Sequence, residues 1–400
     1  MKKPNYQIGV GGTFIGVAAR KYVDDVLTSN RLSYGKYTQK LEEKFARLHN
    51  RKFAIFCNSG TSALQVAVHA LKEYYGWKSG DEVLVPAITF IATSNVILQN
   101  NLKPVFVDVD KDYYEIDPKK IEEKITSKTR AIMPVHLFGQ PCDMDPILRI
   151  AKKHNLKVIE DSCETMFVKY KGEPTGSWGD IACFSTYVAH LLVTGVGGFA
   201  LTNDPDLAVL LKSLFNHGRD NIYLSIDDDK TSDPKKLFKI ANRRFNFIHI
   251  GYSYRATEME AALGLAGLEQ KDNMLIKRQE NARYLTTHLK KFENDLQLPK
   301  IRPQTEHAFM MYPLVIKKDS KIKRDRLIYF LEKENIETRY LMPLLSQPIY
   351  KKLFGNIEKN YPVAKWIDKN GFYIGFHQEL KKSDLDYVIY TFEKFFQTKS

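Results

Sequence analysis

The sequence has only four cysteines in 400 residues, and no two of them form a C-x-x-C pair. They lie far apart along the chain: Cys57, Cys142, Cys163 and Cys183. Such spacing argues against a zinc site, an iron–sulfur cluster and a disulfide framework. We therefore expect reduced, mostly buried thiols and no metal centre.

The sequence also lacks a long uninterrupted apolar run. One of its longest, residues 180–202, is broken by glycines and polar residues, whereas a membrane-spanning helix needs about 20 consecutive apolar residues. Residues 1–14, MKKPNYQIGVGGTF, contain neither the continuous apolar core nor the small-residue cleavage site of a secretory signal. We expect a cytoplasmic protein with no membrane partner.

Charge is not concentrated either, although the formal net charge is +13. The 60 basic residues are dispersed among 47 acidic ones, a pattern that does not favour a nucleic-acid partner. A basic surface of this kind suits an anionic small molecule, such as a nucleotide diphosphate. With 44% apolar side chains the chain can bury a large core, which indicates a globular enzyme of two domains.

The chain from residue 53 to residue 204 alternates short β-branched or aromatic runs with helical patterns. This alternation indicates parallel strands joined by helical crossovers, with ligands at the carboxyl ends of the strands. Strands are predicted at 53–58, 82–87, 103–110, 130–139, 157–161, 180–186 and 197–204, and helices at 62–75 and 144–155.

The remaining pattern predicts a second, smaller unit. Residues 220–245 are polar and predict a surface excursion, and one long helix is predicted from Glu258 through Leu289. A strand at 309–317 and helices at 324–335 and 384–397 follow. We therefore predict an α/β protein with a large domain at 1–255, built on a mostly parallel mixed sheet with an N-terminal arm. Residues 256–400 form a linking long helix and a small α+β C-terminal domain.

Three stretches at predicted strand ends contain candidate cofactor-binding residues. Asn58–Leu64, NSGTSAL, opens a helix with small residues, which predicts either an anion cradle or an ordinary helix N-cap. Asp161 ends a strand, where it could hold a pyridinium nitrogen protonated or cap the following turn, and Glu164 lies three residues on. Phe90 could stack on a planar cofactor or belong to the core.

Together these motifs resemble the DegT/DnrJ/EryC1/StrS sugar aminotransferase family of pyridoxal phosphate (PLP) enzymes. The resemblance covers nearly the whole chain and implies PLP-dependent fold type I, the aspartate aminotransferase-like fold. It rests on the ordered motifs at residues 31–68, 85–97, 104–110, VIEDSCE at 158–164, GSWGDIACFS at 176–185, GVGGFALTND at 195–204 and GYSYRATEMEAALGLAGLEQ at 251–270.

The resemblance implies a role for each matching residue. Glu164 would lie beside the cofactor 3′-oxygen where most of the family has glutamine, Phe90 would stack on the ring, and Asp161 would pair with the pyridine nitrogen. Relatives commonly have asparagine where this chain has Ser253, so the contact of that residue with the partner subunit's phosphate is a weaker expectation. The phosphate would be held by Gly60, Thr61, Ser62 and Ser185.

The family pattern demands a lysine five residues after Ser185 and five before Gly195, but this position is His190. An imidazole cannot form the covalent link that a lysine amine forms with PLP. It can still act as a general acid and base. A core histidine in an inactive paralogue and an engineered replacement of lysine are the alternatives.

His190, Glu164 and the unusual segment at 368–380, DKNGFYIGFHQEL, resemble the sugar 3-dehydratases of this family. The resemblance implies a PLP- and pyridoxamine phosphate-dependent enzyme that removes the C3 hydroxyl of a nucleotide-linked 4-keto-6-deoxy sugar, with glutamate as amino donor, in deoxysugar and surface polysaccharide biosynthesis. Tyr34 and Arg219 are candidate substrate contacts, and a homodimer is expected. The alternatives are a nucleotide-sugar 4-aminotransferase whose lysine has been replaced, and a non-catalytic PLP or nucleotide-sugar binding protein.

Overall fold

The protein folds around a seven-stranded sheet in the order β1-β9-β8-β5-β4-β2-β3, as a computed structural model describes for residues 1–220, 232–243 and 245–397. Neighbouring strands from β8 through β5, β4 and β2 to β3 are parallel, whereas β9 is antiparallel to both its neighbours. The predicted mostly parallel mixed sheet is confirmed. Its strands are β1 (Phe53–Cys57), β2 (Glu82–Pro86), β3 (Lys103–Val107), β4 (Thr129–Ile132), β5 (Lys157–Asp161), β8 (Ile181–Ser185) and β9 (Gly198–Thr202).

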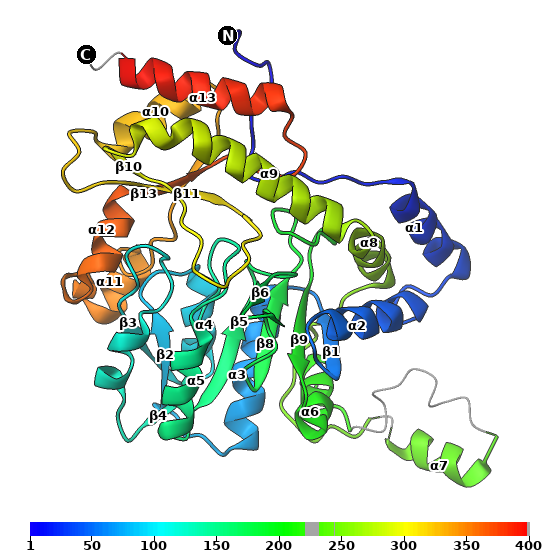
Figure 1. Cartoon of the computed structure of the whole chain (residues 1–400). Helices are drawn as coiled ribbons and strands as arrows, with labels where there is room; N and C mark the ends of the chain where they lie inside the picture. The colour runs from blue at the N-terminus through cyan, green and yellow to red at the C-terminus, as the bar shows by residue number, and fades with distance from the viewer. Residues whose placement is uncertain (221–231, 244, 398–400) are drawn as a thin grey trace.

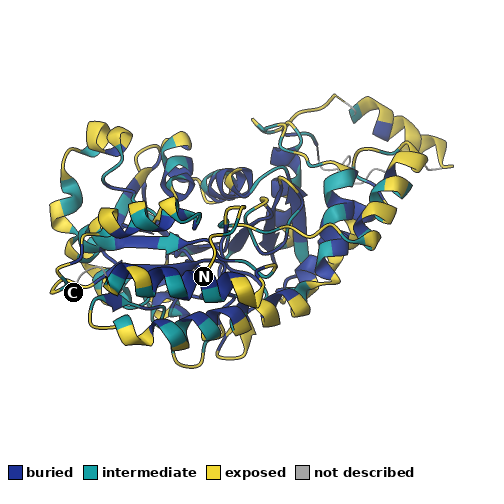
Figure 2. Cartoon of the chain, turned by 90° about the horizontal axis from the view of Figure 1, so that it is seen from above, coloured by how far each residue is buried: buried dark blue, intermediate teal, exposed yellow. Residues whose placement is uncertain are grey.

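Helices cover both faces of this sheet, and Figure 2 shows the strands buried in the interior while the outer faces of the helices are exposed. The crossover helix after β1 begins at Gly60, where the Ser59 side chain accepts a hydrogen bond from the Ser62 amide and caps it. The helices up to residue 268 are α1 (Val17–Ser29), α2 (Lys36–Leu48), α3 (Gly60–Tyr74), α4 (Ile91–Gln99), α5 (Met144–Lys153), α6 (Pro205–Phe215), α7 (Pro234–Arg243) and α8 (Glu258–Leu268), and a two-stranded hairpin joins β6 (Lys169–Tyr170) to β7 (Glu173–Pro174).

A second, antiparallel sheet in the order β10-β11-β13-β12 is built from the C-terminal part of the chain. Figure 1 places this sheet beneath α9 and α13, with both chain termini at the same end of the molecule. The division at residues 255 and 256 stays a prediction. The elements are α9 (Lys271–Leu289), β10 (Leu296–Gln297), β11 (Tyr312–Ile316), α10 (Arg324–Lys333), β12 (Thr338–Tyr340), α11 (Pro348–Phe354), α12 (Pro362–Asn370), β13 (Gly371–Ile374) and α13 (Lys382–Gln397).

Two predicted elements differ in the structure. The predicted helix from Glu258 through Leu289 is two helices, because the chain leaves helical geometry at Gln270 between α8 and α9. The predicted strand at 130–139 ends at Ile132, since Pro134 has no amide hydrogen to donate to the ladder.

The predicted surface excursion at 220–245 lies partly outside the described residues. The part that is described there contains α7, which buries only Ile240. No helix within the described ranges is long and apolar enough to cross a membrane. All four cysteines are unpaired, and only Cys163 among them is partly exposed, as the sequence predicts.

A buried ion pair lies near the carboxyl end of β5. Glu160 accepts hydrogen bonds from Arg51 Nη2 at 3.2 Å, from the Trp178 amide at 2.8 Å and from the Gly176 amide at 3.0 Å. Both charged side chains are almost completely buried, and Glu160 is the carboxylate in direct contact with Arg51, while His136 Nε2 lies 3.1 Å from the other Glu160 oxygen.

We predict that Glu160→Gln lowers the free energy of unfolding by about 3 kcal/mol, because it removes the carboxylate that contacts the buried Arg51 guanidinium. Urea unfolding at one protein concentration measures this. The matched control is Glu123→Gln, whose exposed pair with Lys124 should change stability by less than about 1 kcal/mol. Equal, small losses for both variants would contradict the prediction.

Candidate active site

The candidate site is a cavity of about 390 Å³ at the carboxyl ends of the parallel strands. β1, β2, β5 and β8 all end at this edge, as expected for a ligand site in a sheet of this type. The structure brings seven of the predicted site residues together in its lining: Gly60, Thr61, Phe90, Asp161, Glu164, Ser185 and His190.

One end of the cavity suits a phosphate. The first turn of α3 points backbone N–H groups and the positive end of its dipole at the cavity, beside the hydroxyls of Thr61 and Ser185. A Cβ at Gly60 would come within 2.6 Å of Ser185 Cβ, so only glycine lets the helix start approach this closely. Ser62 is different: its hydroxyl lies 2.9 Å from Ser59 Oγ within the helix cap and does not line the cavity.

The opposite wall carries a buried carboxylate. Asp161 accepts hydrogen bonds from Thr93 Oγ1 at 2.7 Å and from the Cys163 amide at 3.2 Å, so it is held in place and not merely capping a turn. Burial raises the pKa of Asp161, and these two donors oppose the rise. A protonated pyridine nitrogen would supply the counter-charge that this buried carboxylate lacks.

Glu164 is a second buried carboxyl group close to Asp161. Its Oε2 accepts a hydrogen bond from the Phe138 amide at 3.0 Å, and Phe138 adopts a left-handed backbone with φ 59° to present that amide. Burial raises the pKa of Glu164 to about 8. The Phe138 amide opposes this rise, and the nearby Asp161 carboxylate adds to it. Glu164 is therefore a carboxylic acid at neutral pH, able to donate a hydrogen bond as a glutamine does.

His190 follows β8 and lines the same cavity. Its Nδ1 lies 3.2 Å from the Ser185 carbonyl oxygen, which can only accept, so Nδ1 carries the hydrogen and Nε2 is the basic nitrogen. Desolvation lowers the pKa of His190 to about 4, the Ser185 carbonyl opposes that change, and the Arg278 charge adds to it. The imidazole is therefore neutral at neutral pH.

The aromatic and C-terminal walls complete the cavity. Phe90 is 57% exposed and lines the cavity, which excludes its alternative interpretation as a core residue. Sequence reasoning missed Tyr373 and Met311, which distant parts of the chain bring to the site. Burial and the nearby Glu164 carboxyl raise the pKa of Tyr373. Tyr373 belongs to the segment at 368–380 that the sequence marks as unusual.

Besides Ser62, three further predicted residues do not line this cavity. Tyr34 donates its hydroxyl hydrogen to Glu42 at 3.2 Å, and Arg219 lies over the rings of Phe245 and Phe247. Ser253 accepts a hydrogen bond from Arg255 at 3.1 Å. Their roles toward substrate, or toward a partner subunit's cofactor, stay predictions.

The donor set fits PLP. A helix N-terminus with two hydroxyls suits its phosphate, an exposed aromatic ring suits its planar face, and Asp161 suits its pyridinium nitrogen. No cluster of three or more metal-ligating side chains occurs within the described ranges. Fold and site thus define a PLP-dependent enzyme of fold type I.

Comparison with known proteins agrees with this class. Residues 14–393 match the DegT/DnrJ/EryC1/StrS aminotransferase family. GDP-perosamine synthase of Caulobacter vibrioides is 36% identical over 92% of this chain and 93% of its own. GDP-4-keto-6-deoxy-D-mannose 3-dehydratase of Escherichia coli O55:H7 is 28% identical over 92% of this chain and 95% of its own.

A solved structure shows the same fold. The E. coli GDP-4-keto-6-deoxy-D-mannose-3-dehydratase with bound hydrated PLP superimposes with a TM-score of 0.86 and 27% identity, over 98% of this chain and all of that one. This protein belongs to the DegT/DnrJ/EryC1/StrS aminotransferase family, and its cofactor is PLP.

The raised pKa of Glu164 predicts that the free energy of unfolding depends on pH. Between about pH 4.5, where the unfolded carboxyl titrates, and about pH 8, the folded protein holds a proton that the unfolded chain has lost. This group therefore makes the free energy of unfolding fall as pH rises through that window, by up to about 1.4 kcal/mol per pH unit. Glu164→Gln should remove this slope and be increasingly more stable than the parent toward pH 8.

Urea unfolding of Glu164→Gln and of the parent at a series of pH values measures the difference in their free energies of unfolding. The contributions of the other titrating groups cancel in this difference. Glu43→Gln, on the exposed surface of α2, is the control and should track the parent at every pH. A constant difference between Glu164→Gln and the parent would show that Glu164 is ionised in the folded protein.

Proposed function

We propose that this protein removes the C3 hydroxyl of a nucleotide-linked 4-keto-6-deoxy sugar, with glutamate as the amino donor, for deoxysugar and surface polysaccharide biosynthesis. The observation that carries the proposal is the imidazole of His190 in the cofactor cavity. Among the described residues that line this cavity there is no lysine. His190 would act as a general acid and base where the aminotransferases of the family have a covalent anchor.

The cofactor would be held by non-covalent contacts alone. The α3 amides with Thr61 and Ser185 would hold its phosphate, Asp161 its pyridine nitrogen and protonated Glu164 its 3′-oxygen. The chemistry that bound PLP would supply is amino-group transfer to the C4 ketone and a conjugated system that takes up the electron pair left by proton removal and uses it to expel the C3 hydroxyl.

His190 would act as the general base and then the general acid of the reaction. Its hydrogen-bonded Nδ1 keeps Nε2 free to accept a proton, and its lowered pKa means that the site begins with the base form at neutral pH. The same low pKa makes the resulting imidazolium a strong acid, which readily returns the proton to the departing hydroxyl oxygen. No side chain in the described lining can compete by forming a covalent link as lysine does.

A sugar 4-aminotransferase with a replaced lysine is the second candidate. It is favoured by the higher identity to GDP-perosamine synthase, 36% against 28% for the 3-dehydratase. Global identity reflects the scaffold, however, whereas the reaction depends on the side chain at position 190. We therefore favour deoxygenation.

We predict that His190→Asn keeps the affinity for PLP but lowers formation of 3-deoxy product by about 10²–10⁴-fold, the contribution of a positioned general base. His190→Lys should gain a covalent cofactor link and turn part of the turnover into amino sugar. Product mass spectrometry measures the activities, and intact-protein mass after borohydride reduction should rise by one phosphopyridoxyl group in His190→Lys only.

The matched control is His154→Asn at the surface, which should behave as the parent in both assays. Deoxygenation by His190→Asn at the rate of the parent would contradict the proposal. So would a parent that makes no 3-deoxy sugar beside a lysine variant that transaminates efficiently.

We further propose that the working unit is a homodimer. Apolar side chains beside the Gly251–Arg255 motif face solvent in the single chain: Phe247 is 45%, Ile248 53% and Ile250 87% exposed. A cluster of this kind marks a surface that another protein covers.

Light scattering should give about twice 46.2 kDa. Ile250→Asp should shift the protein toward monomer and lower its activity, because a charge would be buried in the interface. Leu353→Asp places the same charge at a 53% exposed position on α11 and should remain dimeric. A fully active monomer would contradict the prediction.

A further inference from the structure

The N-terminal segment, residues 8–13, is pinned to the small sheet. Ile8 pairs in parallel with Ile336, and its amide donates to the Asn335 carbonyl at 2.8 Å. Two residues on, the Val10 amide donates to Glu337 Oε2 at 2.7 Å. Residues 8–10 are therefore held through their backbone amides, and Val10 lines the cofactor cavity.

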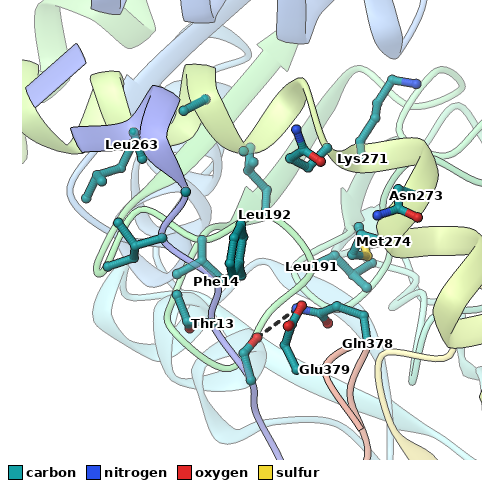
Figure 3. Close-up of a pocket in the computed structure, with 18 of the residues that line it drawn as sticks. Thr13, Phe14, Leu191, Leu192, Leu263, Lys271, Asn273, Met274, Gln378 and Glu379 are labelled. Atoms are coloured by element: carbon teal, nitrogen blue, oxygen red, sulfur yellow. Dashed lines mark hydrogen bonds between the residues drawn. The ribbon is translucent and has the colours of Figure 1, made fainter. Parts of the chain in front are cut away.

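The C-terminal segment at 368–380 packs against residues 8–12. Gly375 lies so close to the Ile8 carbonyl that a Cβ there would overlap it, and a Cβ at Gly12 would overlap the His377 ring. Gln378 Nε2 donates to the Gly12 carbonyl at 2.8 Å (Figure 3). The function proposed above uses none of these contacts, yet they account for much of this unusual sequence.

The other side of the N-terminal segment rests on the loop that carries His190. A Cβ at Gly11 would lie 3.1 Å from Ala189 Cα, which is tighter than an ordinary contact, and Thr13 Oγ1 donates to the Val188 carbonyl at 3.4 Å. The segment thus touches the two residues immediately before His190.

The His190 loop needs such support because it separates two hollows. Ala189 and His190 line the cofactor cavity, whereas Leu191 and Leu192 line a groove of about 730 Å³ on the other side. Figure 3 shows Thr13 and Phe14 beside these leucines at the groove. Leu191 and Leu192 are almost completely buried and fix the loop after His190, whereas Tyr187 and Val188 before it are 50% and 42% exposed. The part of the loop before His190 therefore depends on contacts from other segments.

We propose that residues 8–13 are a positioning element that holds the His190 loop, and with it the imidazole, against the cofactor cavity through contacts at Gly11, Gly12 and Thr13. The C-terminal segment at 368–380 anchors this element from behind. The catalytic consequence of this positioning rests on the proposed function. The support that residues 8–13 give to the His190 loop can be measured without any turnover.

Gly11→Ala tests the contact directly, because its Cβ pushes against Ala189. We expect kcat for 3-deoxy sugar formation to fall by about 10- to 100-fold, the usual effect of misplacing a reacting group by a fraction of an ångström to an ångström. The KM for sugar and the affinity for PLP should stay within about twofold, because the residues that hold the phosphate and pyridine ends are untouched. Gly16→Ala is the control, since its Cβ would meet only the exposed ring of Phe14.

Gln378→Met is the second variant, which removes the hydrogen bond to the Gly12 carbonyl without adding bulk against the loop. It should lower kcat in the same way, and it decides the question if Gly11→Ala does not fold. Both variants are compared with the parent and Gly16→Ala as full-length, PLP-loaded protein.

The second readout is the rate at which diethyl pyrocarbonate modifies His190, followed by peptide mass mapping across the 10 histidines. A loosened loop should make His190 react several-fold faster in Gly11→Ala and Gln378→Met, while surface His154 reacts as in the parent and Gly16→Ala behaves as the parent throughout. An unchanged His190 rate in both folded variants overturns the positioning role, even if kcat falls.

The two proposals fail separately. A faster His190 rate in a protein whose parent makes no 3-deoxy sugar would refute the deoxygenase function while supporting the positioning element. Normal deoxygenation by the parent, with unchanged His190 modification rates in the variants, would refute the positioning element while supporting the deoxygenase function.

Discussion

The parallel pairing of β2, β4, β5 and β8 is the constraint on which the site depends. Because parallel strands share one direction, their carboxyl ends meet at a single edge of the sheet. Asp161 is the last residue of β5, and Glu164 follows it. Ser185 is the last residue of β8, and His190 follows it. The N-terminus of α3, which follows β1, points at the same place, so the groups proposed to touch the cofactor converge at this edge.

Burial then sets the chemistry of the groups brought together, with opposite results for an acid and a base. Exclusion of water disfavours charge, so it keeps Glu164 protonated and His190 unprotonated at the same pH. Glu164 becomes a hydrogen-bond donor, and His190 becomes a proton acceptor with its Nε2 free. A lysine at position 190 would instead be a nucleophile, and that single difference of chemical type separates deoxygenation from transamination in this account.

Much of this could be predicted from the sequence, because short motifs at strand ends record both fold and site. Asp161, Ser185 and His190 lie where spacing placed them. The break at Gln270 could not be predicted, since the helical pattern continues across it, and residues 130–139 read as one strand although Pro134 interrupts the ladder. Val10 and Tyr373 line the cavity because the N-terminal segment and β13 of the second sheet pack beside it, which no local pattern reveals.

The fate of the glutamate nitrogen tests the central claim most directly. The protein is incubated with PLP, [15N]glutamate and, in turn, each of a panel of nucleotide-linked 4-keto-6-deoxy sugars, and the label is located by mass spectrometry and 15N NMR. If His190 makes this family member a deoxygenase, the label is released as ammonium in step with a 3-deoxy-4-keto sugar. Label retained in a stable 4-amino sugar, with no ammonium and no loss of the C3 oxygen, would contradict the account.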